Sequence, residues 1–80
     1  MIQISIHYFA GLRDATKKDV EIITIKKGAT AKSVYQHLIT KYDLPDTNQY
    51  KVAVNDSFAS YDTKIMDQDK LVFIPPVTGG

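Results

Sequence analysis

The segment from residue 2 to residue 9 reads IQISIHYF and alternates apolar with polar side chains over most of its length. Successive side chains of a strand point to opposite faces of a sheet, so alternation sorts them into two sets. One face carries Ile2, Ile4, Ile6 and Tyr8. The other face carries Gln3, Ser5, His7 and Phe9. This pattern predicts a half-buried strand over residues 2–9.

A second β-branched run, from Val20 to Ile25, predicts another strand. Between the two runs, Ala10 to Lys18 has mixed polarity, with Gly11 near its start. We expect a loop there, with at most one helical turn around Leu12, Arg13 and Asp14. The loop is longer than a tight hairpin uses, so pairing of the two strands is an inference.

A helix is predicted after Thr30, whose hydroxyl suits an N-cap. Apolar side chains recur there at helical spacing, at Ala31, Val34, Tyr35, Leu38 and Tyr42. The third helical position is Ser33 and not Glu or Gln, so the capping box is expected to be incomplete. Because proline disfavours the helical conformation in the residue before it, the helix should stop before Pro45.

The remaining chain predicts three more strands. They are Lys51–Val54, a short strand at 58–60 after the turn residues 55–57, and Lys70–Ile74. A polar loop is expected at 46–49, and a tight turn at Asp67-Gln68-Asp69. One helix cannot cover both faces of a sheet, so the predicted class is α+β, a mixed sheet packed on one main helix. The prolines at 75 and 76 cannot donate to a ladder and end the regular structure.

Composition sets limits on function. Eighty residues fit one domain, predicted at 1–74, with a tail at 75–80. The net charge of +1 lacks the basic footprint of nucleic-acid binding, and no apolar run suits a membrane span. Zero cysteines exclude disulfides, Cys-ligated zinc and thiol nucleophiles. No signal peptide is evident at the start, so a cytoplasmic protein is expected.

The ending PPVTGG, from Pro75 to Gly80, is the most informative stretch, since two of the four glycines are its last residues. The proline pair favours an extended base, and a glycine tip has no side chain to obstruct a narrow channel. The structural alternative is a frayed terminus. The six residues reach roughly 20 Å when extended, enough to place a terminal carboxylate in another protein's active site.

The chemistry that suits such a tip is carboxyl activation. A carboxylate is a poor electrophile, and coupling to AMP converts it into a mixed anhydride that a sulfur or amine nucleophile attacks. The sequence has no phosphate-binding glycine-rich loop and no cysteine, so we expect no cofactor on this chain and an ATP-using partner.

Other candidate sites are weaker. His7 and His37 lie on different predicted elements without ligand spacing, and Asp67 with Asp69 is better explained as a polar turn than as a calcium loop. No metal site is therefore predicted. No serine lies in a nucleophile-elbow sequence, so no catalytic triad is predicted either.

Two phenylalanines remain open between two interpretations. Phe9 lies on the polar face of the first strand. Phe58 comes directly after a turn that does not require a large apolar side chain. Beside the charge of Arg13 they would mark a partner surface. Alternatively, both rings close a small cluster under the loops.

The whole chain resembles the small subunit of molybdopterin synthase, a family of sulfur carriers with a ubiquitin-like β-grasp fold. The resemblance rests on four segments, YFAGLRD at 8–14, VAVN at 52–55, DQD at 67–69 and PPVTGG at 75–80. Because it has both the first and the last of these segments, the chain resembles the molybdopterin branch of these carriers more than the thiamine branch.

The resemblance implies a function. An adenylating enzyme would activate the Gly80 carboxylate with ATP, and a sulfurtransferase or persulfide donor would convert it to a thiocarboxylate. The thiocarboxylate would give its sulfur to cyclic pyranopterin monophosphate in the large synthase subunit, during molybdenum cofactor biosynthesis. Thr78 and Gly79 would occupy the partner's channel, with Pro75, Pro76 and Val77 at its mouth.

The resemblance also implies partners. Family contacts with the large subunit map onto Phe9, Arg13, Phe58 and Ile74, in an assembly of two small and two large subunits. The chain would be a sulfur-donating subunit and not an enzyme by itself. The alternatives are a sulfur carrier for thiamine or another thio-metabolite, a protein modifier conjugated through Gly80, and an interaction domain with an inert tail.

Overall fold

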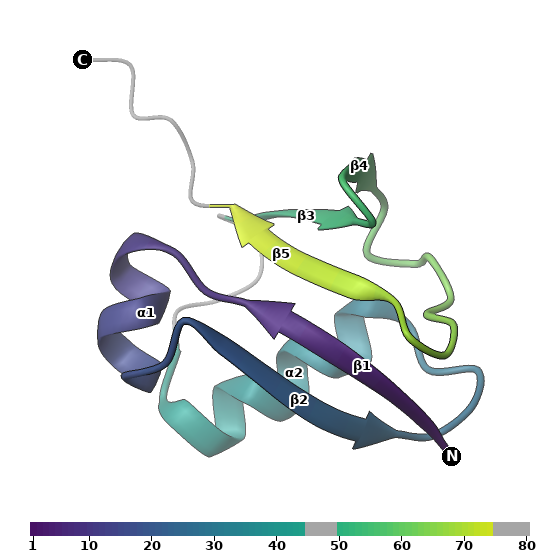
Figure 1. Ribbon diagram of the computed structural model, residues 1–80, viewed down its shortest axis with the longest axis horizontal. Coiled ribbons are helices and arrows are strands. Elements are labelled where there is room, and N and C mark those ends of the chain that lie inside the picture. The colour runs from purple at the N-terminus through teal and green to yellow at the C-terminus, as the bar shows by residue number, and fades with distance from the viewer. Residues whose placement is uncertain (45–49, 75–80) are drawn as a thin grey trace.

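A five-stranded mixed sheet, in the order β2-β1-β5-β3-β4, forms the frame of the protein (Figure 1). The computed structural model describes residues 1–44 and 50–74, so the predicted loop at 46–49 and the tail at 75–80 lie outside the described residues. The elements are β1 (Ile2–His7), α1 (Ala10–Thr16), β2 (Val20–Ile25), α2 (Ala31–Tyr42), β3 (Lys51–Val54), β4 (Ser57–Ala59) and β5 (Lys70–Ile74).

The pairing confirms a mixed sheet. β1 lies antiparallel to β2 and parallel to β5, and β3 lies antiparallel to both β5 and β4. Parallel neighbours need a crossover, and α2 lies within the chain that joins β1 to β5. The fold class predicted from the sequence, one main helix on a mixed sheet, is therefore confirmed.

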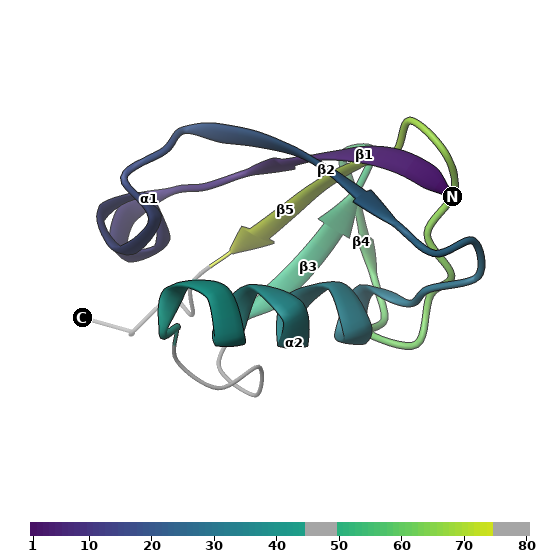
Figure 2. The ribbon, with the colours of Figure 1, turned by 90° about the horizontal axis from the view of Figure 1, so that it is seen from below.

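The core lies between α2 and one face of the sheet (Figure 2). The predicted helical stripe is buried at Ala31, Val34, Tyr35 and Leu38. Tyr35 meets Phe73 of β5 with ring centroids 4.8 Å apart. The opposite face of the sheet has no helix over it in the described residues, and it faces the viewer in Figure 1.

The segment predicted as a loop at 10–18 contains the helix α1, so that prediction is wrong. Leu12 and Thr16 lie one helical turn apart, and both are buried. The Thr16 hydroxyl donates to the Leu12 carbonyl at 2.9 Å, which closes this turn. Burial of Leu12 in the core supplies the stabilisation that a seven-residue helix lacks by itself.

The capping box of α2 is complete, contrary to prediction. Thr30 Oγ1 accepts a hydrogen bond from the Ser33 N–H, and Ser33 Oγ accepts one from the Thr30 N–H at 3.0 Å. The short serine side chain therefore reaches back as Glu or Gln does in the usual box. At the other end, Asp43 takes a left-handed conformation after Tyr42, so α2 stops before Pro45 as predicted.

Two strand boundaries differ from prediction. β1 ends at His7, two residues early, because Phe9 already forms the N-cap of α1. β4 covers Ser57–Ala59, one residue before the predicted 58–60. Asn55 and Asp56 both have positive φ, 52° and 71°, which defines a two-residue hairpin turn and lets Ser57 pair with Val54.

The turn at 67–69 anchors three strands. Asp67 Oδ1 accepts from the Gln3 N–H of β1 at 2.8 Å. Asp69 accepts from the Asn55 side-chain amide after β3, also at 2.8 Å. Asn55 in turn accepts from the Lys70 N–H at the start of β5. The DQD segment is thus a structural junction.

A second polar cluster surrounds the buried side chain of Glu21 on β2. Tyr8 and Tyr42 each donate a hydroxyl to it at 2.8 Å, Lys41 donates at 2.7 Å and Lys18 at 3.3 Å. Burial acts to raise the pKa of Glu21, but these hydrogen bonds outweigh it and lower the pKa to about 2. Through one carboxylate, the cluster ties β2 and α2 to Tyr8, the residue that follows β1.

This cluster predicts a specific acid sensitivity. Because the folded-state pKa of about 2 lies below the ordinary 4.5, the contribution of Glu21 is fully present above pH 4.5 and is lost as the pH falls toward 2. Urea denaturation across this range should show a smaller loss of unfolding free energy for Glu21→Gln than for the wild type. Asp14→Asn, which changes an exposed carboxylate on α1, should behave like the wild type. Equal pH dependence of Glu21→Gln and wild type would contradict this assignment.

Candidate protein-interaction site

Apolar side chains gather on the open face of the sheet around β3, β4 and β5. They line a groove of about 290 Å³, which we call the outer groove. Its lining residues are His7, Phe9, Ala53, Asp56, Phe58, Lys70, Val72 and Ile74. Phe9 is 52% exposed and Phe58 73% exposed, so neither ring is packed in a cluster under the loops. The open face therefore presents large apolar side chains to solvent.

Strand register explains why the groove forms there. Along β5, Leu71 and Phe73 point into the core, and the alternate residues Val72 and Ile74 point to the open face. Ala53 of β3 pairs with Val72 on one side and with Phe58 on the other. Because the alanine side chain is smaller than those on either side of it, the surface is recessed at Ala53.

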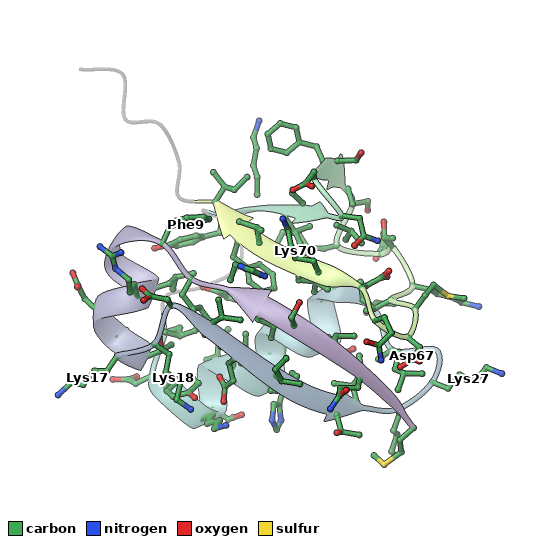
Figure 3. The ribbon with its side chains drawn as sticks, viewed as in Figure 1. Phe9, Lys17, Lys18, Lys27, Asp67 and Lys70 are labelled. Atoms are coloured by element: carbon green, nitrogen blue, oxygen red, sulfur yellow. The ribbon has the colours of Figure 1, made fainter. Side chains whose placement is uncertain are left out.

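Phe9 and Phe58 reach the groove from different elements. Phe9 is the N-cap of α1, and Figure 3 shows it beside the last residues of β5. Phe58 lies on the edge strand β4, where the Lys51 ammonium lies 5.9 Å from its ring centroid. The two rings thus approach the groove from β1–α1 and from β4.

The groove has one polar end. Lys70 Nζ lies 2.8 Å from Asp56 Oδ1, and this hydrogen-bonded ammonium holds the pKa of Asp56 below its ordinary value. His7 also lines the groove. A partner would therefore meet an apolar floor with charged groups at one side, the usual composition of a protein interface.

The predicted site residues divide into three sets. Phe9, Phe58 and Ile74 line one groove. Arg13 does not line it; the guanidinium lies 3.5 Å from Asp19, and both side chains are exposed. Gly80 and the tail residues 75–79 lie outside the described residues, and the tail begins directly after Ile74.

Sequence reasoning missed five groove residues: His7, Ala53, Asp56, Lys70 and Val72. Four of them follow a signal that was present. His7 shares a face with Phe9 in the alternating first strand, and Lys70 and Val72 share a face with Ile74 in the last strand. Ala53 lies on the face of its strand opposite to Val52 and Val54. Asp56 could not be placed without the hairpin register.

Within residues 1–44 and 50–74, no group of three or more metal-ligating side chains comes together. Over the same residues, no helix is long and apolar enough to cross a lipid bilayer.

The order of elements, with a mixed sheet folded over one helix, defines a ubiquitin-like β-grasp protein. More specifically, the chain belongs to the ThiS family, which it matches over residues 6–80. The family resemblance inferred from the sequence is therefore confirmed.

Two curated relatives span the chain. It is 32% identical to the molybdopterin synthase sulfur carrier subunit of Mycobacterium tuberculosis, with all of both chains covered. It is 28% identical to the subunit of the same name from Escherichia coli, over 96% of this chain and 99% of the relative.

Solved structures share the fold. The small archaeal modifier protein 1 of Haloferax volcanii superposes with a TM-score of 0.84 at 17% identity, over 96% of this chain and all of that chain. A chain in the complex of subunits 1 and 2 of the molybdopterin-converting factor from Helicobacter pylori superposes with a TM-score of 0.69 at 22% identity. That match covers 99% of this chain and all of the other chain.

Exposure of Phe58 predicts that it contributes little to stability. Phe58→Ala should change the free energy of unfolding by less than about 0.5 kcal/mol, since the ring is 73% exposed. Phe73→Ala removes a fully buried ring and should cost about 3–5 kcal/mol. Urea denaturation of both variants measures the difference, and a similar loss for Phe58→Ala would place Phe58 in the core.

Proposed function

We propose that this chain is the sulfur-carrier subunit of a molybdopterin synthase and acts through Gly80. The observation that carries the proposal is the position of the PPVTGG segment, which follows directly after Ile74, a residue of the outer groove. In a complex with a partner docked on the groove, the tail would start at the docking surface. Relatives named as sulfur carrier subunits, aligned over nearly the whole chain, support this assignment.

The first chemical step is activation of the Gly80 carboxylate. A carboxylate oxygen attacks the α-phosphorus of ATP, which forms the acyl-adenylate and releases pyrophosphate. A persulfide sulfur on a sulfurtransferase or other donor then attacks the Gly80 carbonyl and expels AMP. A thiol cleaves the resulting acyl disulfide, leaving the thiocarboxylate on Gly80 and a disulfide on the donor. The partner binds the ATP.

The second step is sulfur transfer. The Gly80 thiocarboxylate sulfur attacks a carbon of cyclic pyranopterin monophosphate in the large subunit, and an oxygen leaving group departs. Water then cleaves the bond between the Gly80 carbonyl carbon and sulfur, which restores the carboxylate. Two such transfers supply the dithiolene sulfurs. The large subunit supplies the groups that act on the pterin, and this chain supplies the sulfur.

Docking uses the outer groove. Phe9, Phe58 and Ile74 bury apolar surface against the large subunit, and Arg13 lies at the rim of the contact. Thr78 and Gly79 occupy the partner's channel, which larger side chains would obstruct, and Pro75, Pro76 and Val77 lie at its mouth. The assembly contains two small and two large subunits.

Intact mass spectrometry tests the chemistry directly. Incubation of the chain with ATP, an adenylating enzyme of this pathway and a persulfide donor should replace one oxygen of Gly80 by sulfur. An unchanged mass, while the same enzymes modify a known carrier, would contradict the proposal. A ladder of conjugates to lysines in a cell extract would instead favour a protein modifier. Sulfur incorporation with delivery to thiazole and none to the pterin would favour the thiamine alternative.

Two tail variants serve as controls. Deletion of Gly80, or addition of one alanine after it, should abolish sulfur transfer, because the reactive carboxyl no longer lies at the required position. The thermal midpoint of both variants should match that of the wild type, since Ile74 already ends β5. Full transfer by either variant would show that the reaction does not need a terminal carboxyl at position 80, and would favour the inert-tail alternative.

Binding to the large subunit tests the groove. Phe58→Asp should weaken the complex at least tenfold, measured by calorimetry, because a charge replaces an apolar anchor. Met66→Asp is a matched control, since Met66 is 64% exposed and does not line the outer groove. Equal effects of the two substitutions would remove the groove from the interface.

A further inference from the structure

The sheet has a second exposed feature, the free edge of β2. Among the described strands, β2 has a neighbour on one side only. The Tyr8 N–H donates to the Asp19 carbonyl at 2.8 Å, which sets the alternation of the antiparallel ladder between β1 and β2. By that alternation Glu21, Ile23 and Ile25 bond to β1. The N–H and C=O groups of the alternate residues, Val20, Ile22 and Thr24, then face outward.

Apolar surface lies on both sides of this edge. On the open face, Val20 is 46% exposed and Ile22 is 61% exposed. On the other side, a groove of about 420 Å³ lies between the end of β2 and the first half of α2; we call it the edge groove. Its lining residues are Met1, Thr24, Ile25, Lys26, Ala29, Ser33, Val34 and His37. An added strand would find apolar contacts for the side chains of both its faces.

Lysines flank the edge at both ends. Lys17 and Lys18 precede β2, and Lys26 and Lys27 follow it; Figure 3 shows Lys17 and Lys18 at one end and Lys27 beyond the other. Lys18 shares the Glu21 carboxylate with Lys41. The other three have no ion pair within the described part of the chain. The edge therefore carries an excess of positive charge.

The same lysines oppose pairing with a second copy of this chain. A two-fold antiparallel pairing with Ile22 opposite itself would place Lys18 opposite Lys26, and Lys17 opposite Lys27. Like charges directly opposite each other destabilise a strand pair, and edge lysines commonly prevent such self-association. A partner of the opposite charge would meet no such repulsion.

We propose that the free edge of β2 binds an acidic peptide in extended conformation, which adds a strand to the sheet. The outward N–H and C=O groups of Val20, Ile22 and Thr24 supply backbone hydrogen bonds. Alternate apolar side chains of the peptide fill the edge groove and cover Ile22, and acidic residues at its ends meet the lysines. The site lies at the opposite edge of the sheet from β4, so it leaves the outer groove free for another partner.

A synthetic peptide of four alternating valines and isoleucines, with two aspartates at each end, is the probe. Amide hydrogen exchange of the full ¹⁵N-labelled chain gives the readout. Without peptide, the amides of Val20, Ile22 and Thr24 should exchange quickly, because they face solvent. With peptide, these three amides should become protected, and the amides of His7, Ala53 and Val72 should not change.

Charge variants provide the control. Lys26→Glu combined with Lys27→Glu should weaken peptide binding roughly tenfold, whereas Lys51→Glu, on β3, should leave it unchanged. A peptide with lysine in place of aspartate should not bind. The proposal is overturned by absent protection at about 1 mM peptide, by changes at the outer groove instead, or by protection that rises with protein concentration alone. The last outcome would assign the edge to a second copy.

Discussion

A single helix of twelve residues must cover a five-stranded sheet, and it can cover only one face. This constraint places every large core residue, including Tyr35 and Phe73, on the side of α2. It leaves the other face to be managed by side-chain choice. Polar Gln3 and Ser5 occupy that face of β1, while apolar side chains gather at the β3–β5 end, where the outer groove forms. The site thus follows from the layer arrangement.

Polar clusters hold this arrangement in place. Glu21 joins β2 and α2 to Tyr8 through four hydrogen-bonding partners, and the Asp67–Asp69 turn joins β1 to β3 and β5. The Asp67–Asp69 turn lies just before β5, at the opposite end of that strand from Ile74.

Much of this architecture was predictable from the sequence, for identifiable reasons. β-branched runs gave the bounds of β2, and Pro45 limited α2. α1 was missed because its stability comes from burial of Leu12, a tertiary effect that a seven-residue segment does not reveal. Phe9 and Phe58 could be proposed from the residues themselves, and Ile74 from the family resemblance. Their convergence with Asp56 and Lys70 depends on the pairing of β3 with β5, which links segments far apart in the chain.

Cross-saturation NMR of the methyl-labelled chain bound to a molybdopterin synthase large subunit tests the central claim most directly. If the outer groove is the docking surface, irradiation of the large subunit should attenuate the methyl signals of Ala53, Val72 and Ile74. The inward methyls of Leu71 and Val34 should keep their intensity. Attenuation confined to Val20 and Ile22 of β2, or to residues of α2, would contradict the account.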